Sequence, residues 1–335
     1  MTAWRVTFVL LACLGTACRS SPVDPPRFQE ENDDPPSPPI TAEQLREHVE
    51  FLASDEMAGR ATPSPELDHA ARYIADELAA AGAQPLPGAS GYEQRFPCGG
   101  LLSDATSANV LAYLPGRDPE LADEAVFVTA HYDHIGVAED GEDTIYNGAN
   151  DNASGVAVTL ALARHLRGRA LGRSVVFVAF CGEELGLNGS AHYVDAPLWP
   201  LERTRTVVNL EMLGRAEPST PITAWITGHE LSTFGAFFAT HADATRVRFV
   251  SGMEIGPVEG DAFARSDNYP FATAGIVAHS ISTGKLDAYY HAANDEAASL
   301  DYERMATIAN AIGDVVVELA RTDAPPTWTQ PPSHD

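Results

Sequence analysis

The hydrophobic pattern divides the chain into apolar runs separated by amphipathic segments. The runs are rich in Val, Ile, Phe and Ala, and several are apolar at nearly every position, as expected for strands buried on both faces of a sheet. They are NVLAYL (109–114), AVFVTAHY (125–132), SVVFVAF (174–180), TVVNLEML (206–213), ITAWIT (222–227) and GIVAHSI (275–281). The pattern therefore predicts a central sheet of mainly buried strands.

Other segments carry apolar residues at helical spacing, namely 41–54, 64–82, 153–166 and 299–321. Thr41 is a candidate N-cap for the first of these helices, and Gly82 ends the second. Strands that alternate with helices indicate an α/β fold in which helices cover the sheet. We therefore predict a single α/β domain over residues 41–322, with a central mixed, mainly parallel sheet flanked by helices.

The two ends of the chain have different compositions from the centre. A positive charge, a short apolar run and small residues precede Cys18, which is the pattern of a secretory signal that is too short to cross a bilayer. The residues that end at Cys18 resemble a bacterial lipobox, although Gly15 stands where leucine is usual. We predict a signal peptide over residues 1–18, with lipidation at Cys18 and simple secretion as the alternative. Residues 19–40 and 323–335, rich in proline and acid, are predicted to form a disordered tether and tail.

Charge and composition exclude several kinds of binding partner and of chemistry. The formal net charge of −26 argues against binding to nucleic acid or to acidic membrane surfaces, because both would repel the protein. Membrane contact is therefore expected only through the lipid anchor. The chain contains one lysine, Lys285, which leaves almost no candidate for Schiff-base chemistry. Cys98 and Cys181 remain after the signal, and we predict that both are free thiols, with a disulfide as the alternative.

Polar residues crowd the ends of the predicted strands, where open α/β sheets bind their ligands. Each lies just after an apolar run or just before a helix: His131 and Asp133, Asp151, Glu183 and Glu184, Glu211, and His291. Individually, Asp151 could be a helix cap, and the paired glutamates could be acids at a helix N-terminus. A complete set at one edge of the sheet favours a functional site instead.

Imidazoles and carboxylates are ligands that suit zinc. Two histidines and three carboxylates are enough for two ions if one carboxylate bridges them. Paired ions activate water near neutral pH and stabilise a tetrahedral intermediate. The adjacent Glu183 and Glu184 allow one carboxylate to bind metal while the other handles protons. The residues thus predict a zinc site that could hold two Zn²⁺ per chain and activate water.

This ordered set resembles the co-catalytic zinc aminopeptidases, a family that also contains glutamate carboxypeptidases and glutaminyl cyclases. The resemblance spans nearly the whole folded region and includes LASDEMAGR (52–60) and SDNYPF (266–271). It implies the zinc exopeptidase-like three-layer sandwich and an exported metalloaminopeptidase that hydrolyses N-terminal residues from peptides. A single-zinc enzyme like the glutaminyl cyclases and a catalytically silent zinc-binding lipoprotein are the alternatives.

The same resemblance implies the metal ligands. His131, Asp151 and Glu211 would hold one zinc, and Asp151, Glu184 and His291 would hold the other, so that Asp151 bridges the two ions. Glu211 departs from the aspartate that is usual in the family. Its additional methylene shifts the carboxylate by about one bond length, which we interpret as a tuned site.

The resemblance also implies catalytic roles beside the ligands. Glu183 would be the general base, and Asp133 would orient His131. Tyr290, next to His291, matches a position that hydrogen-bonds the oxyanion in some relatives. The remaining histidines singled out by the sequence are interpreted as structural: His134, His192, His229, His241 and His279.

Overall fold

The computed structural model describes Met1 and residues 38–98, 105–252, 262–285 and 287–332. The chain divides into residues 1–33 and 34–335, and the fold described below belongs to the second unit. The predicted signal peptide, its lipidation site and most of the tether lie outside the described residues. Within the described part, none of the helices is both long enough and apolar enough to span a membrane.

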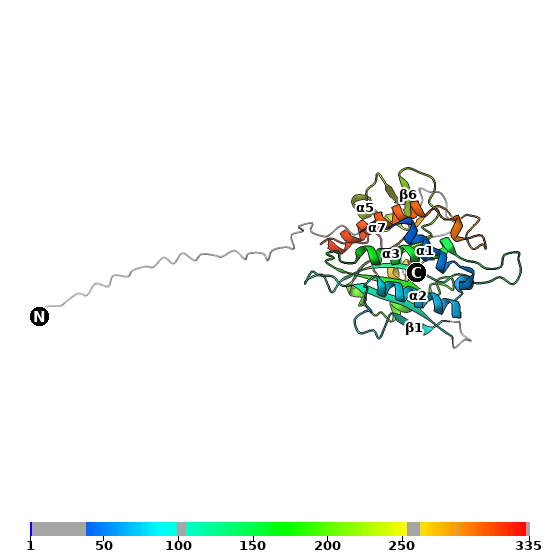
Figure 1. Ribbon diagram of the computed structural model, residues 1–335. Coiled ribbons are helices and arrows are strands. Elements are labelled where there is room, and N and C mark those ends of the chain that lie inside the picture. The colour runs from blue at the N-terminus through cyan, green and yellow to red at the C-terminus, as the bar shows by residue number, and fades with distance from the viewer. Residues whose placement is uncertain (2–37, 99–104, 253–261, 286, 333–335) are drawn as a thin grey trace. The chain divides into compact units, whose positions relative to one another are not determined.

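A single sheet forms the centre of the folded unit (Figure 1). Among the described residues it has the strand order β1-β2-β4-β3-β5-β8-β6-β7. The central neighbours β4, β3, β5 and β8 are parallel, whereas β1–β2, β2–β4 and β6–β8 pair antiparallel and β6–β7 pair parallel. This confirms the predicted mixed sheet. The strands are β1 (Glu93–Pro97), β2 (Thr106–Leu114), β3 (Ala125–His131), β4 (Ser174–Phe180), β5 (Thr204–Leu210), β6 (Ile222–Ile226), β7 (Val247–Ser251) and β8 (Ala278–Thr283).

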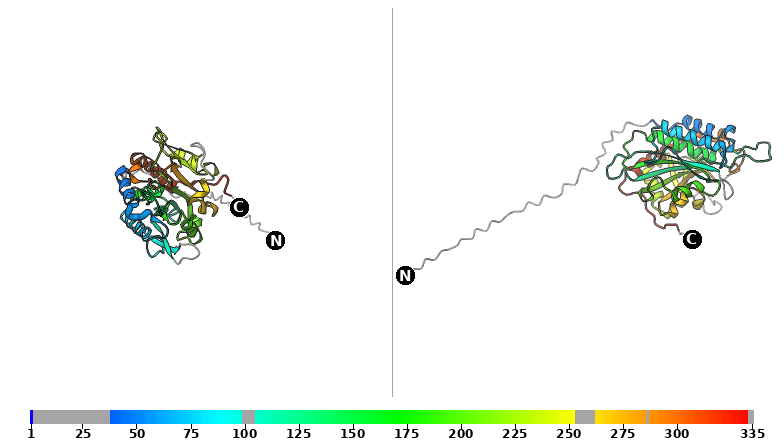
Figure 2. Two further views of the ribbon diagram at one scale, coloured as in Figure 1. Left: turned by 90° about the vertical axis from the view of Figure 1, so that its right-hand side faces the viewer. Right: turned by 90° about the horizontal axis from the view of Figure 1, so that it is seen from below.

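Helices cover both faces of the sheet, as the right-hand view of Figure 2 shows. Successive side chains of a strand point to opposite faces, so Val126 and Val128 belong to the apolar cluster that contains residues of α1, α2, α3 and α7, while Phe127 packs with α4 and α6. The result is three layers with two apolar interfaces. The helices are α1 (Ala42–Leu52), α2 (Pro65–Ala80), α3 (Ser154–Leu166), α4 (Asn188–Asp195), α5 (Phe234–His241), α6 (Asn268–Thr273) and α7 (Tyr302–Arg321).

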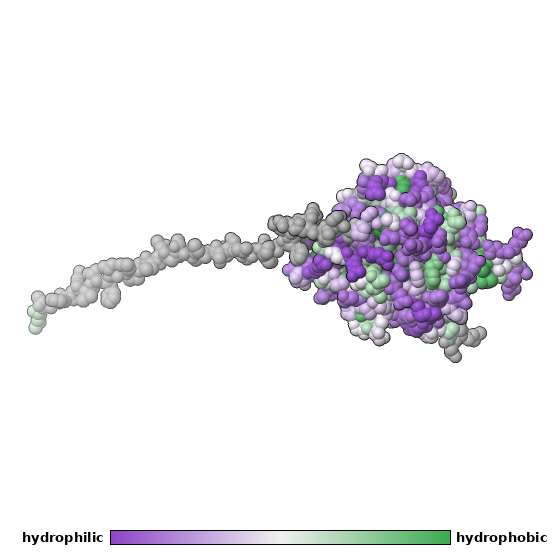
Figure 3. All heavy atoms as spheres, viewed as in Figure 1, coloured by the Kyte–Doolittle hydropathy of each residue, from purple (hydrophilic) through white to green (hydrophobic). Residues whose placement is uncertain are grey.

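The surface differs from these interfaces in composition. The face of the folded unit seen in Figure 3 is mostly hydrophilic, with small and scattered apolar areas. The large apolar side chains of the central strands are instead buried on both sides, for example Phe127, Phe177 and Phe180, each with 0% exposure. Strands buried in this way are apolar at every position, which is why their sequences read as continuous apolar runs.

Long elements match the sequence pattern more closely than short ones. Strand β4 has the predicted bounds, and Thr41 caps α1 by accepting a hydrogen bond from the backbone N–H of Gln44 (3.3 Å). The pattern did not predict β1, β7, α4, α5 or α6, which are 5 to 8 residues long. Elements of this length contain too few turns or alternations for a clear period.

The end of the chain contacts the fold where composition indicated a disordered tail. Within residues 323–332, the carbonyl of Thr327 accepts from the N–H of Thr233 (2.9 Å), and the indole N–H of Trp328 donates to the carbonyl of Gly275 (3.0 Å). Trp328 also packs against both apolar interfaces. Partial burial of the apolar ring of Trp328 therefore stabilises the contact between this proline-rich segment and the folded unit.

The parallel strands at the centre decide where the polar residues meet. The carboxyl ends of β3, β4, β5 and β8 lie at the same edge of the sheet because these neighbouring strands run in the same direction. His131 ends β3, Glu183 and Glu184 follow β4, Glu211 follows β5, and His291 follows β8. The fold therefore gathers at one edge residues that are far apart in the sequence.

A fully buried arginine joins the loops behind this edge. Arg60 has 0% exposure and donates from Nε to the carbonyl of Tyr132 (2.8 Å) and from Nη2 to that of Gly148 (3.0 Å). Its Nη1 donates to the carbonyls of Asn147 (2.7 Å) and Leu52. Burial lowers the pKa of Arg60 to about 10, and nearby carboxylates oppose that shift. Arg60 thus links α1 to the two loops that follow β3.

We expect Arg60→Met to lower the free energy of unfolding by about 3 kcal/mol or more, because several buried carbonyls lose their donor. Arg72→Met, at an exposed position on α2, is the matched control and should change it by no more than about 0.5 kcal/mol. Denaturant unfolding of the metal-free proteins measures both. Equal effects of the two substitutions would show that these bonds contribute little to stability.

Candidate metal centre

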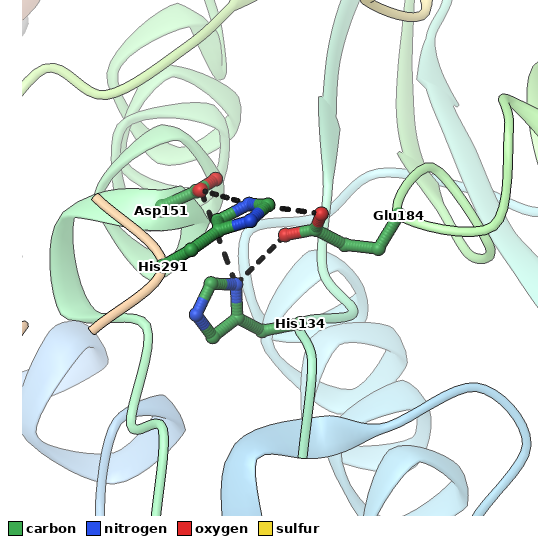
Figure 4. Close-up of side chains that lie close together, drawn as sticks. All are labelled: His134, Asp151, Glu184 and His291. Atoms are coloured by element: carbon green, nitrogen blue, oxygen red, sulfur yellow. Dashed lines mark hydrogen bonds and ion pairs between the residues drawn. The ribbon is translucent and has the colours of Figure 1, made fainter. Parts of the chain in front are cut away.

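The structure brings the predicted metal ligands together in two groups that share Asp151. His131, Asp151 and Glu211 form the first group. Asp151, Glu184 and His291 lie in the second, together with His134. Within each group the candidate ligand atoms lie within 4.8 Å of one another. Figure 4 shows the second group, whose side chains point toward one another.

The distances in the first group fit a zinc ion. His131 Nε2 lies 3.3 Å from Asp151 Oδ1 and 3.4 Å from Glu211 Oε2. Tetrahedral zinc binds nitrogen and oxygen at about 2.0–2.1 Å, which separates any two ligand atoms by roughly 3.3 Å. The three atoms are therefore spaced as ligands of one ion would be.

The second group has the same spacing and uses the other oxygen of Asp151. His291 Nε2 lies 3.3 Å from Asp151 Oδ2 and 3.1 Å from Glu184 Oε2. This nitrogen is buried and forms no well-aligned hydrogen bond with any described residue. This nitrogen and the two carboxylate oxygens are close together without hydrogen-bond geometry, as expected of ligand atoms that all point at one metal ion. Asp151 thus has the geometry of a bridging carboxylate.

A network of backbone and side-chain bonds fixes the loop that carries Asp151. The N–H groups of Asn150 and Asp151 both donate to the carboxylate of Asp295, at 3.0–3.1 Å. Arg215 donates from Nη2 to the same carboxylate at 2.6 Å. The buried Asp295 was not recognised from the sequence. Its position just after His291 places it where it can fasten the Asp151 loop to the His291 loop.

Glu211 is held by one oxygen and presents the other. Its Oε1 accepts hydrogen bonds from Asn209 Nδ2 (3.1 Å) and Ser266 Oγ (2.5 Å). Its Oε2 is the oxygen nearest to His131. The longer side chain of glutamate therefore reaches the same group that the resemblance assigns to aspartate, and Ser266 and Asn209 fix its end.

Glu183 lies beside the metal ligands. Together with residues of both groups, it lines a cavity of about 90 Å³. Burial raises the pKa of the Glu183 carboxyl well above its ordinary value, and the negative charge of Glu211 adds to this effect, while His131 opposes it. A carboxyl with a raised pKa accepts a proton readily near neutral pH, as a general base must.

Asp133 lies next to His131, as its predicted orienting role requires. His131 Nδ1 is 3.2 Å from the backbone oxygen of Asp133 and 3.7 Å from its carboxylate Oδ1. The carboxylate also accepts from Thr62 Oγ1 (3.0 Å) and from the backbone N–H of Glu183 (3.2 Å). Asp133 therefore connects the β3 end to the segment that carries Glu183.

Tyr290 reaches the same cavity from the loop after β8. Its ring stacks on that of His291, with 4.0 Å between centroids, and its hydroxyl lies 3.4 Å from Arg265 Nη2. Burial raises the pKa of Tyr290, and the charges of Asp151 and Glu184 act in the same direction. The hydroxyl consequently keeps its proton and can donate a hydrogen bond.

The electrostatics of the centre reflect an excess of carboxylates. Burial lowers the pKa of His131, but Glu211 and the neighbouring acids outweigh it and raise the pKa well above the ordinary value. The close carboxylates of Asp151 and Glu184 raise the pKa of His291 to about 9. Burial favours the neutral form of Glu184, yet its contacts with His134 and His291 lower its pKa to about 2. Clustered anions of this kind favour a bound cation, and metal binding displaces protons from such ligands.

His134 is a member of the second group that sequence analysis assigned to structural histidines. Its side chain has 0% exposure, and its Nδ1 lies 2.8 Å from Glu184 Oε1 and 4.0 Å from Asp151 Oδ2 (Figure 4). The structure thus places at the metal centre a histidine that the sequence analysis interpreted as structural. Its position three residues after His131, beyond the end of β3, was the signal available in the sequence.

Comparison with known proteins agrees with this geometry. The model of peptidase family M28 matches residues 109–316. Aminopeptidase YwaD of Bacillus subtilis is 28% identical over 235 residues, which cover 67% of this chain and 47% of that protein. The chain thus spans about half the length of that relative. The uncharacterized protein YfbL of Escherichia coli is 26% identical over 306 residues, covering 83% of this chain and 88% of that protein.

Solved structures show the same fold at low sequence identity. A zinc aminopeptidase from Bacillus subtilis superposes with a TM-score of 0.65 at 17% identity, covering 85% of this chain and 96% of the other. Porphyromonas gingivalis glutaminyl cyclase gives a TM-score of 0.64 at 17% identity, with 83% and 98% covered. These likenesses establish the three-layer architecture.

Removal of the Glu211 carboxylate tests the first ligand group. We expect about two zinc ions per chain in the unchanged protein and about one in Glu211→Ala, because Asp151, Glu184 and His291 still provide three ligands. Elemental analysis of purified protein gives the ratio, and Glu217→Ala, at a nearby exposed position, is the control. An unchanged zinc content in Glu211→Ala would remove Glu211 from the ligand set.

Proposed function

The chain belongs to peptidase family M28, and from this premise we propose that it is a two-zinc aminopeptidase that releases N-terminal residues from peptides. One observation carries the proposal. Asp151 directs one carboxylate oxygen to His131 and the other to His291, each at 3.3 Å, with Glu211 and Glu184 completing the two groups. Such a bridged arrangement of histidines and carboxylates is suited to paired zinc ions.

The described residues fit zinc in chemistry as well as in spacing. His131, Asp151 and Glu211 would hold one ion, and Asp151, Glu184 and His291 the other. When bound, such paired ions act as Lewis acids that activate a water molecule and polarise the scissile carbonyl. Family membership and the zinc aminopeptidase among the structural neighbours support zinc as the metal.

The cavity beside the centre offers space for the N-terminal residue of a peptide. Its described lining includes the carboxylates of the metal centre and one arginine, Arg265. Two bound zinc ions would offset the charge of those carboxylates. Met212 and Trp225 add apolar wall, and Thr227 adds a hydroxyl, so the side chain of the N-terminal residue would occupy this part of the cavity.

Glu183 and Tyr290 provide the remaining chemistry. Glu183 would take a proton from the attacking water and deliver it to the leaving amine, since its raised pKa favours both transfers near neutral pH. Tyr290 would donate its hydroxyl proton in a hydrogen bond to the oxygen that becomes negative. Arg265, beside the Tyr290 hydroxyl, adds positive charge near that oxygen.

Glu183→Gln tests the proposed base. We expect zinc content to stay unchanged while turnover of aminoacyl-anilides falls by at least about 100-fold, because the amide cannot accept the proton. Glu230→Gln, on the exposed surface, is the matched control and should retain full turnover. Loss of zinc together with activity would identify Glu183 as a ligand. A zinc content of one, with cyclisation of N-terminal glutaminyl peptides and no anilide release, would favour the cyclase alternative.

We also propose that the enzyme is exported and anchored by a lipid at Cys18. The support is the secretory pattern of residues 1–18, followed by a tether with several prolines and acids at 19–40. The lipid would hold the folded unit at a membrane that its negative charge does not otherwise favour.

Identification of the mature N-terminus tests the proposed lipid anchor. Mass spectrometry of membrane-extracted protein should find a lipid-modified Cys18 as the first residue, and Cys18→Ala should move the protein to the soluble fraction. An unmodified N-terminus well past Cys18 in the wild-type protein would contradict the anchor and support simple secretion.

A further inference from the structure

His134 is a buried histidine for which the proposed reaction has so far required no role. It follows β3 by three residues, and its ring lies beside that of His291 in the second ligand group (Figure 4). Its Nδ1 lies 2.8 Å from Glu184 Oε1, and its Nε2 is buried without a hydrogen-bond partner among the described residues. The contact with Glu184 is therefore the principal polar interaction of this ring.

The distances distinguish a hydrogen bond from metal ligation. The proposed ligand pairs lie 3.1–3.4 Å apart, as tetrahedral zinc requires. His134 Nδ1 is closer than this to Glu184 Oε1, at 2.8 Å, and farther from Asp151 Oδ2, at 4.0 Å. Two zinc ligands only 2.8 Å apart would subtend an angle of roughly 85°, far from tetrahedral. A separation of 2.8 Å is instead typical of a charge-assisted hydrogen bond.

The direction of this bond follows from the chemistry of the partners. An ionised carboxylate only accepts hydrogen bonds, so His134 Nδ1 carries the proton and donates it to Glu184 Oε1. With Oε1 occupied, Oε2 is the oxygen that faces His291, at 3.1 Å. The bond thus selects which oxygen of Glu184 is presented to a metal.

The surroundings of His134 hold the ring in this orientation. Its backbone N–H donates to the carbonyl of Arg60 (3.2 Å), the residue that anchors the neighbouring loops. A Cβ atom at Gly148 would lie 2.6 Å from the ring, so the ring fits only because this position has no side chain. Gly148 also has a φ of +59°, which favours glycine there. The ring of His291 meets that of His134 edge to face, 5.5 Å away.

We propose that His134 is a positioning residue that fixes Glu184 as a ligand through Oε2 alone. This inference rests on the proposed two-zinc function and extends it to the support of the second site. Without the bond, the Glu184 carboxylate could rotate. Part of the free energy of metal binding would then be used to fix its orientation. Loss of such an outer partner typically weakens metal affinity by about 10–100-fold.

A pair of variants with nearly equal shape tests the bond. His134→Asn keeps an N–H donor near the position of Nδ1, whereas His134→Leu has the same size without a donor. We expect His134→Leu to weaken one of the two zinc sites by about 10–100-fold and to leave the other unchanged, and His134→Asn to recover most of the affinity. Competition with a chromophoric chelator during zinc titration of the metal-free protein measures both sites, and His241→Gln, at an exposed position, is the control.

Each outcome bears on the inference separately from the proposed activity. If both variants weakened zinc binding equally, His134 would act only through packing. If His134→Leu left the zinc affinity unchanged, the positioning role would be overturned, whether or not the protein is an active peptidase. A wild-type chain that binds one zinc, with an affinity that His134→Leu does not change, would also overturn it. An inactive chain that shows the expected affinities would refute only the peptidase proposal.

A measurement on the unsubstituted protein covers the case in which a variant does not fold. Nitrogen NMR of the zinc-loaded protein with labelled histidine should show His134 with its proton on Nδ1. A metal-bound and unprotonated Nδ1 would instead make His134 a ligand and overturn the positioning role.

Discussion

The crowding of carboxylates at one edge of the sheet is the constraint on which the site depends. Asp133 and Asp151 are buried, and the partly buried Glu183, Glu184 and Glu211 lie close to them, where like charges repel strongly. Burial, helped by the charge of Glu211, raises the pKa of Glu183, whereas the carboxylates raise the pKa of His131 and His291 because they favour the charged imidazolium. Positive charge would compensate this repulsion, and the bridging geometry of Asp151 indicates where the two proposed zinc ions would lie.

The rest of the fold holds these carboxylates in place. Parallel pairing of the central strands brings their carboxyl ends to one edge, and Arg60 ties the loops behind that edge through backbone carbonyls. The Arg215–Asp295 pair fixes the backbone of the Asp151 loop. Rigid support of this kind matters because a metal site tolerates displacements of only about 0.2 Å in its ligand distances.

In two of the proposed ligand carboxylates, one oxygen accepts hydrogen bonds from other side chains and the other oxygen is left for a metal. Glu211 gives Oε1 to Ser266 and Asn209, and Glu184 gives Oε1 to His134. In both cases Oε2 remains for the position where a metal would lie. The same principle therefore operates at both sites, with hydroxyl and amide donors at one and an imidazole at the other. Such partners fix the orientation of a ligand before the metal arrives.

The sequence alone determined the α/β class and the buried central strands, because a strand buried on both faces must be apolar at nearly every position. The sequence also determined which polar residues follow the strands, because ligand sites of open α/β sheets lie at strand ends. It also marked Glu183 and Glu184 by their position after β4. Only the tertiary structure revealed the contacts of His134 and Asp295, since both residues bond to segments distant in the chain. The short edge elements and the packing of Trp328 were likewise decided by tertiary contacts, which leave no period in the local sequence.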